Sequence, residues 1–164
     1  MVARYSGIVE KIWNWINHFD YDQYWKMREY VSSHKGGLKA YYYLYRIKKM
    51  DSYHNASLGT HLSFPCAKFS GRPILPHGLN GIIISNEASI GKNCTIYHQV
   101  SIAGGNGGAP TVGDNVLLGA GAKLVGPIHI GNNVKIGAGC VVAMDIPDNA
   151  TVVMEKPRII MQKK

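Results

Sequence analysis

The sequence predicts a mainly β protein, a parallel β-helix built from hexapeptide coils, with a short α-helical segment at the N-terminus. Aliphatic residues recur every six positions through the C-terminal half of the chain, with one interruption, and small residues usually follow them. A period of six fits neither the 3.6-residue turn of a helix nor a long two-residue alternation. It is typical of a chain that turns a corner every six residues and stacks coil on coil. The aliphatic column comprises Ile84, Ile90, Ile96, Ile102, Val112, Leu118, Leu124, Ile130, Ile136 and Val142.

A second column of small or aliphatic residues lies four positions beyond the first and is also expected to face inward. Its members are Ala88, Cys94, Val100, Val116, Ala122, Ile128, Val134, Cys140 and Ile146. Two of the three cysteines of the chain belong to this column, so packing explains them better than a disulfide framework does.

Between Ile102 and Val112 the spacing of the aliphatic column rises from six to ten. The extra residues are rich in glycine, from Gly104 to Gly108. A loop inserted at one corner leaves the register of the core intact, and such loops usually line a site.

Residues 1–51 have a different composition and are predicted to form a helical segment. Helical spacing of apolar residues extends over 8–19, 24–31 and 38–50, and Asp20 or Asp22 could cap the second helix. We expect the many aromatic residues to pack the helices together and onto the first coil, whose edge backbone groups need a cover. A docking surface for another subunit or for a membrane is the alternative. The β-helix is assigned to residues 52–153, opening at Ala56–Gly59, and a basic tail to 154–164.

Composition and charge exclude several classes of protein. The 164 residues suit one domain, and the 46% hydrophobic content is sufficient for a core. The formal charge of +8 comes from dispersed basic residues, so nucleic-acid binding is not expected. Neither a signal peptide nor an apolar run of membrane-spanning length is evident, which predicts a cytoplasmic protein and makes the Asn-x-Ser/Thr triplets at Asn55, Asn93 and Asn149 chance matches.

Two of the seven histidines have a setting that suits chemistry. His77 is followed by glycine in Leu75–Gly81, which leaves its ring uncrowded, and His98 lies about one coil of 18 residues later. A lone imidazole suits general-base catalysis because its ordinary pKa is near 6.5. The histidine spacing is not that of a metal site, so we expect no metal.

The chain resembles the serine acetyltransferase branch of the hexapeptide acyltransferases. The motifs that carry this resemblance are His77-Gly78, Gly81–Ile84, Val100–Gly105, Gly119–Gly126 and Lys156–Ile159. The resemblance implies a left-handed parallel β-helix and a homotrimer that binds acetyl-CoA in the groove between neighbouring subunits. It also implies an acetyl-CoA-dependent O-acetyltransferase.

The resemblance further implies roles for individual residues. His77 would be the general base, and Asp51 would orient it as the aspartate of a catalytic triad does. Backbone at Gly104, Gly105, Ala122 and Ala138 would contact CoA, and Lys123, Lys156 and Arg158 would meet its phosphates. His98 and Asn80 are candidates for contacts with the acceptor.

Departures from the family pattern bear on the acceptor. Pro76 stands where the family has an aspartate, and Gly108-Ala109 stands where it has an Arg-His pair that holds the amino acid. The segment Pro76–Gly81 resembles enzymes that O-acetylate sugars of capsule or lipopolysaccharide. We therefore predict a surface-polysaccharide sugar as the acceptor, with serine, for cysteine biosynthesis, as the alternative. A γ-type carbonic anhydrase with zinc on three histidines and a catalytically silent scaffold are further alternatives.

Overall fold

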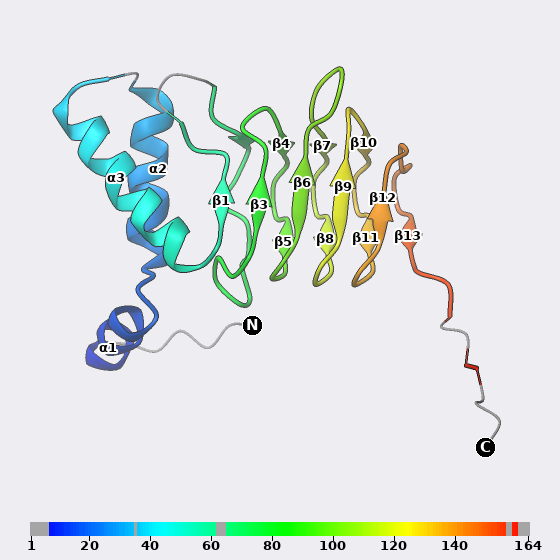
Figure 1. Cartoon of the computed structure of the whole chain (residues 1–164), viewed down its shortest axis with the longest axis horizontal. Coiled ribbons are helices and arrows are strands. Elements are labelled where there is room, and N and C mark those ends of the chain that lie inside the picture. Colours follow the sequence, from blue (N-terminus) through cyan, green and yellow to red (C-terminus); the bar gives the residue numbers. More distant parts are fainter. Residues whose placement is uncertain (1–6, 35, 62–64, 157–158, 161–164) are drawn as a thin grey trace.

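The computed structural model describes residues 7–34, 36–61, 65–156 and 159–160. It contains three helices at the N-terminal end of a stack of parallel coils (Figure 1). The predicted parallel β-helix with a short helical segment is thereby confirmed. None of the described helices has the length and apolarity required to cross a membrane.

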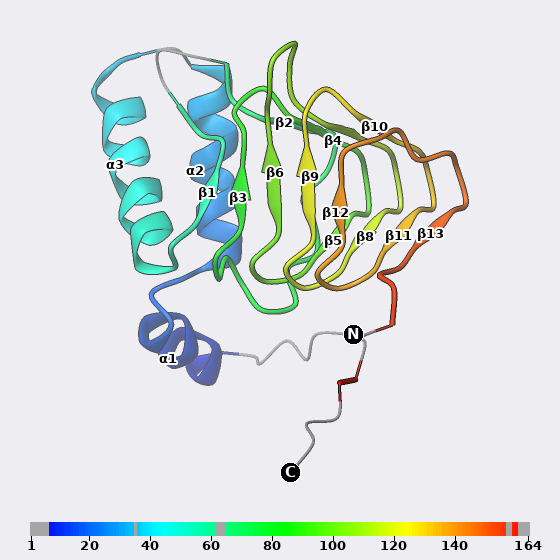
Figure 2. The ribbon, with the colours of Figure 1, turned by 45° about the vertical axis from the view of Figure 1, so that its right-hand side comes forward.

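Short strands at the sides of the coils form three parallel sheets. The first sheet, in spatial order, contains β1 (Ser57–Leu58), β3 (Ile83–Ile84), β6 (Ser101–Ala103), β9 (Lys123–Val125) and β12 (Val141–Val142). The second contains β10 (His129–Ile130), β7 (Thr111–Val112), β4 (Ser89–Ile90) and β2 (Lys68–Phe69). The third contains β13 (Thr151–Val152), β11 (Lys135–Ile136), β8 (Leu117–Leu118) and β5 (Thr95–Ile96). Figure 2 shows the three sides of the coils surrounding one interior.

The interior is filled by the two columns that the hexapeptide spacing predicts. All ten aliphatic residues of the first column are at most 3% exposed. The register explains the uniformity, because Ile84, Ile102, Leu124 and Val142 stand above one another in neighbouring strands of the first sheet. Every residue of the second column is buried too, including Cys94 and Cys140, whose thiols are free.

An asparagine ladder joins the coils at the corner between the second and third sheets. Asn93, Asn115, Asn133 and Asn149 all have φ between 55° and 61°, a left-handed conformation that asparagine tolerates. Each side-chain amide donates to the amide oxygen of the next, over 3.0–3.2 Å. Asn93 and Asn149 belong to two of the Asn-x-Ser/Thr triplets that we expect to be chance matches. The ladder gives a structural reason for an asparagine at these two positions.

Helix α2 (Tyr21–Ser33) covers the first coil, as predicted. Asp20 caps it by accepting a hydrogen bond from the amide of Gln23 at 2.9 Å, whereas Asp22 lies in its first turn. Trp25 packs edge-on against Phe69 of β2, with ring centroids 5.1 Å apart. Helix α3 (Leu38–Tyr53) lies against α2 and runs directly into β1.

Helix α1 (Ile8–Ile16) differs from the expectation that its apolar residues pack onto the other helices. None of its residues is buried, and it lies apart from α2 and α3 in both views (Figures 1 and 2). Its role in the fold is to form one wall of the pocket described next.

Candidate active site

The candidate active site lies at the corner where each coil passes from the third sheet to the first. Amide-to-carbonyl hydrogen bonds of 2.8–3.0 Å stack these corners: Gly81 to His54, Gln99 to Asn80, Gly121 to His98 and Gly139 to Ala120. His54, Asn80, His98 and Ala120 therefore occupy equivalent positions in successive coils. The residue after each has a positive φ, as at Gln99 with 58°.

The corner that carries His77 is longer than its neighbour. Ile74 pairs with Thr95, and Ile83 pairs with Ser101, so nine positions separate the paired residues in this coil against six in the next. The three extra residues form a bulge on an otherwise regular stack. His77 lies on the bulge and is exposed to solvent.

The bulge brings the ring of His77 to that of His98 in the next coil. Their Nδ1 atoms are 2.6 Å apart and their ring centroids 4.7 Å apart. Tyr97 meets His77 edge-on, at 5.6 Å between centroids. A hydrogen bond between two Nδ1 atoms requires one of them to carry the proton and the other to present its lone pair. The Nε2 atom of each ring takes no part in this contact.

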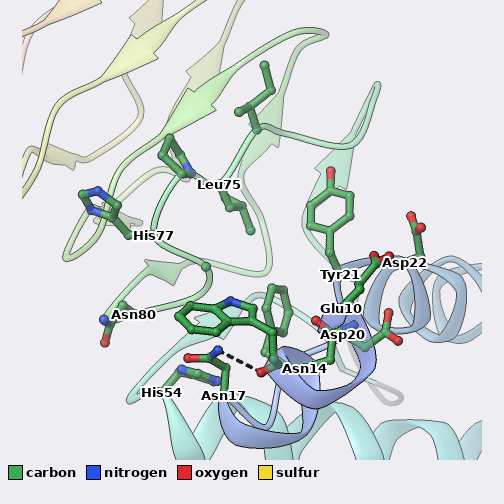
Figure 3. A pocket seen from close by; sticks show the side chains of 15 residues that line it. Glu10, Asn14, Asn17, Asp20, Tyr21, Asp22, His54, Leu75, His77 and Asn80 are labelled. Carbon is green, nitrogen blue, oxygen red and sulfur yellow. Dashed lines mark hydrogen bonds between the residues drawn. The ribbon is translucent and has the colours of Figure 1, made fainter. Parts of the chain in front are cut away.

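A pocket of about 580 Å³ opens beside His77. Its walls come from α1, the start of α2 and the segment from Ile74 to Asn80. In the view of Figure 3, His77 and Asn80 lie at one side of the pocket, and three carboxylates lie at the other. These are the side chains of Glu10, Asp20 and Asp22.

The three carboxylates differ in what already engages them. Asp20 caps α2, and Asp22 lies 3.3 Å from the guanidinium of Arg72. Glu10 is half-buried on α1. No sequence pattern connects these residues with His77, because the pocket depends on how the helices dock against the first coils.

Asp51 does not meet His77 in any described contact. It is 2% exposed near the end of α3, where its Oδ1 accepts a hydrogen bond from the Tyr24 hydroxyl at 2.8 Å. Its Oδ2 lies 3.8 Å from the Lys48 ammonium. Burial raises the pKa of Asp51 to about 6, an effect that Tyr24 and Lys48 only partly oppose. The structure therefore gives Asp51 a place in the packing of the helices.

His54 lines the pocket, although only His77 and His98 have a sequence setting that suits chemistry. It is half-buried two coils below His98, and its Nε2 atom has no hydrogen-bond partner among the described residues. Burial lowers its pKa. The stacking of one corner on the next places it at the pocket. Extra residues hide this relation in the sequence, because 26 positions separate His54 from Asn80, against 18 from Asn80 to His98.

The residues predicted to bind CoA are spread along the stack. Gly104 and Gly105 are exposed in the loop after β6, and Lys123 is exposed on β9. Ala122 is fully buried, and its amide and carbonyl are already bonded to neighbouring backbone. Ala138 and Lys156 are exposed nearer the C-terminal end of the stack, and Arg158 lies outside the described residues.

The part of the chain that the structure describes contains no group of three or more side chains able to hold a metal ion. His77 and His98 form a pair without a third ligand. The zinc site of three histidines that a carbonic anhydrase would need is not formed by these residues.

Comparison with known proteins identifies the repeat domain. Residues 109–143 match the family model described as bacterial transferase hexapeptide (six repeats). A serine acetyltransferase of Mycobacterium tuberculosis is 41% identical over 104 residues, which cover 61% of this chain and 45% of the relative. One from Helicobacter pylori is 40% identical over 105 residues, covering 61% of this chain and 60% of the relative. The chain spans about half the length of the curated relatives it matches.

Solved structures give the same result. The serine acetyltransferase of Brucella abortus strain S19 superposes with a TM-score of 0.67 at 28% identity, covering 84% of this chain and 55% of that one. That of Neisseria gonorrhoeae in complex with serine has a TM-score of 0.61 at 34% identity, covering 80% of this chain and 52% of that one.

These relatives contradict the prediction that the acceptor is a sugar of a surface polysaccharide. They are named serine acetyltransferases at about 40% identity, which favours the alternative acceptor, serine. The prediction assumed that the charges holding an amino acid must stand at the family positions now occupied by Pro76 and Gly108-Ala109. The carboxylates of Glu10, Asp20 and Asp22 bring negative charge to the pocket from the helices, of the same sign as the missing aspartate. The repeat domain of this chain thus matches the hexapeptide transferase family model over residues 109–143 and is similar to the corresponding part of serine acetyltransferases.

Proposed function

We propose that the protein is an acetyl-CoA-dependent serine O-acetyltransferase with His77 as its general base. The observation that carries this proposal is an accessible imidazole beside a pocket of about 580 Å³, in a domain 41% identical to a serine acetyltransferase. Its Nδ1 atom is hydrogen-bonded to His98, whereas no hydrogen bond of its Nε2 atom is found among the described residues. The carboxylates across the pocket support an amino acid as the acceptor, because the ammonium group of serine is a cation.

In the proposed reaction, Nε2 of His77 takes the proton from the serine hydroxyl as the oxygen attacks the thioester carbonyl carbon of acetyl-CoA. The carbon–sulfur bond then breaks, and the thiolate of CoA receives the proton from His77. The products are O-acetylserine and free CoA. Backbone N–H groups or a polar side chain beside the carbonyl would stabilise the oxyanion.

The donor site and the assembly belong to the same proposal. The exposed backbone at Gly104, Gly105 and Ala138 would line the CoA groove, and the ammonium groups of Lys123 and Lys156 would meet phosphates. We propose a homotrimer, since the family model is that of hexapeptide transferases and a groove between subunits would enclose the exposed ring of His77. We also propose that the enzyme acts in the cytoplasm.

The test is the release of free thiol from acetyl-CoA by the purified protein, with L-serine compared against D-serine, L-threonine and no acceptor. Replacing His77 by Ala should lower kcat by about 10²- to 10⁴-fold. His129→Ala is the matched control, because His129 is exposed on β10 in the second sheet, and it should leave the rate unchanged. Near-normal turnover of His77→Ala would remove it as the base, and failure to acetylate L-serine would remove serine as the acceptor.

A further inference from the structure

We propose that His98 is the positioning residue of His77. Through the hydrogen bond between the two Nδ1 atoms, it would hold His77 in the tautomer whose Nε2 atom can accept a proton. His98 would thereby take the place of a carboxylate. The inference deepens the proposed function and rests on His77 being its general base. It assigns His98 a role other than the acceptor contact expected from the sequence.

The fold itself enforces the pairing of the two rings. His98 occupies the corner position directly above Asn80, to whose coil it is tied by the hydrogen bond from Gln99 to the Asn80 carbonyl at 2.8 Å. The three extra residues of the preceding corner move His77 outward, into reach of the next coil. The resulting contact of 2.6 Å leaves no room for another group between the two Nδ1 atoms.

No carboxylate competes for this position among the described contacts of His77. Asp51, the carboxylate expected to orient it, is buried against Tyr24. Pro76, the residue before His77, has neither a side-chain acceptor nor a backbone N–H. The Nδ1 atom of His98 is therefore the acceptor that the structure provides.

The hydrogen bond and the role of His77 as the base together determine the tautomer of each ring. For Nε2 of His77 to accept a proton from a hydroxyl, its Nδ1 must already carry hydrogen. That hydrogen is donated to the lone pair of His98 Nδ1, so neutral His98 carries its own hydrogen on Nε2. When His77 becomes an imidazolium during the reaction, the same hydrogen bond gains a charged donor and becomes stronger.

One added proton reverses the arrangement. If His98 is protonated, its Nδ1 donates to His77 Nδ1, which forces hydrogen onto the Nε2 atom of His77 and removes the base. The other titratable groups that face the pair are Tyr97, whose ring contacts His77, and, around the shared pocket, His54, Glu10, Asp20 and Asp22.

Two substitutions separate positioning from other roles. His98→Leu removes the acceptor, whereas His98→Asn keeps an oxygen able to accept from Nδ1–H but does not titrate. We expect kcat of His98→Leu to fall about 10- to 100-fold with KM for serine nearly unchanged, as for partners that orient a functional imidazole. His98→Asn should recover most of kcat, because its amide oxygen can still accept the hydrogen bond from Nδ1 of His77. His129→Asn is the control and should match the unsubstituted protein.

A second measurement does not depend on activity. Nitrogen-15 NMR of the histidine rings in the full chain should show His77 protonated at Nδ1, and a shift toward the Nε2–H tautomer in His98→Leu. An unchanged tautomer, or a loss expressed in KM with kcat intact, would overturn the proposal and make His98 an acceptor contact. If the unsubstituted protein does not acetylate serine, the proposed function fails, and the NMR result still decides whether the pair exists as described.

Discussion

Removal of the guanidinium of Arg28 should destabilise the end of the solenoid. Arg28 lies on the inner face of α2 and is only 4% exposed. Its Nη2 atom donates to the carbonyl oxygens of Leu58 at 3.1 Å and Ala67 at 2.6 Å, both on the edge of the first coil. Its guanidinium also lies over the rings of Phe69, at 4.4 Å, and Trp25, at 5.3 Å. No earlier coil exists in the described stack to satisfy these carbonyls.

The magnitude follows from what Arg28→Met removes and what it relieves. Each hydrogen bond from a charged donor contributes about 1.5–3 kcal/mol, and a desolvated cation–π contact about 2 kcal/mol. Against this stands the cost of burying the cation, which also lowers the pKa of Arg28. Methionine keeps most of the apolar stem, so we expect a net loss of about 2–4 kcal/mol in the free energy of unfolding.

Urea unfolding followed by far-ultraviolet circular dichroism measures this loss at a fixed protein concentration, since assembly adds stability by mass action. Arg72→Met is the matched control. Arg72 pairs with Glu29 at 2.7 Å and Asp22 at 3.3 Å near the surface, where such pairs contribute about 0–1 kcal/mol. Equal destabilisation by the two substitutions would refute the view that Arg28 stabilises the fold by donating to the carbonyl groups at the edge of the first coil.

Three further predictions follow from the packing of the coils and helices. Burial raises the pKa of Asp51 to about 6, against about 3.9 in an unfolded chain, so the folded state binds more protons between these values and stability falls as pH rises through them. Asp51→Asn should abolish up to about 3 kcal/mol of this pH dependence, measured as the difference in the free energy of unfolding between pH 4 and pH 7 in urea titrations. The same difference in the variant and the unsubstituted protein would contradict this prediction. Gly119→Ala should cost about 1–3 kcal/mol, because its Cβ would lie 2.6 Å from the amide nitrogen of Ala138, whereas Gly71→Ala, with 3.7 Å of clearance, should be neutral in the same assay. Leu124 is fully buried in the middle of the stack, so Leu124→Ala should lower the free energy of unfolding by about 2–5 kcal/mol. A loss below 1 kcal/mol would show that the packing of its column contributes little to stability.

The coils could be predicted from the sequence because their pattern is local. A residue such as Leu118 faces inward whenever the six-residue spacing is maintained, whatever happens elsewhere in the chain. Even the interruption before Val112 leaves the register intact, since Val112 still pairs with Ile90 of the coil before it. The cap of α2 is equally local: the sequence predicts Asp20 or Asp22, and the structure has Asp20.

The parts that could not be predicted depend on contacts between distant segments. The resemblance implies that Asp51 orients His77, but α3 extends to Tyr53 and the carboxylate is buried against Tyr24 of α2. The exposure of α1 is a similar case. Its apolar spacing predicts a helix correctly, but spacing alone does not say which surface, if any, covers it.

The candidate site lies where the hexapeptide pattern fails, and the failure has a physical consequence. A regular corner repeats the same backbone path in every coil, so residues such as Ala120 and Ala138 simply stack above one another. Three extra residues in one corner must leave the stack, because the paired strands on either side hold their register. They project a side chain beyond the wall, and its neighbour is then a residue of the next coil. In this chain both residues are histidines, His77 and His98, so the irregularity that obscures the repeat also creates the imidazole pair.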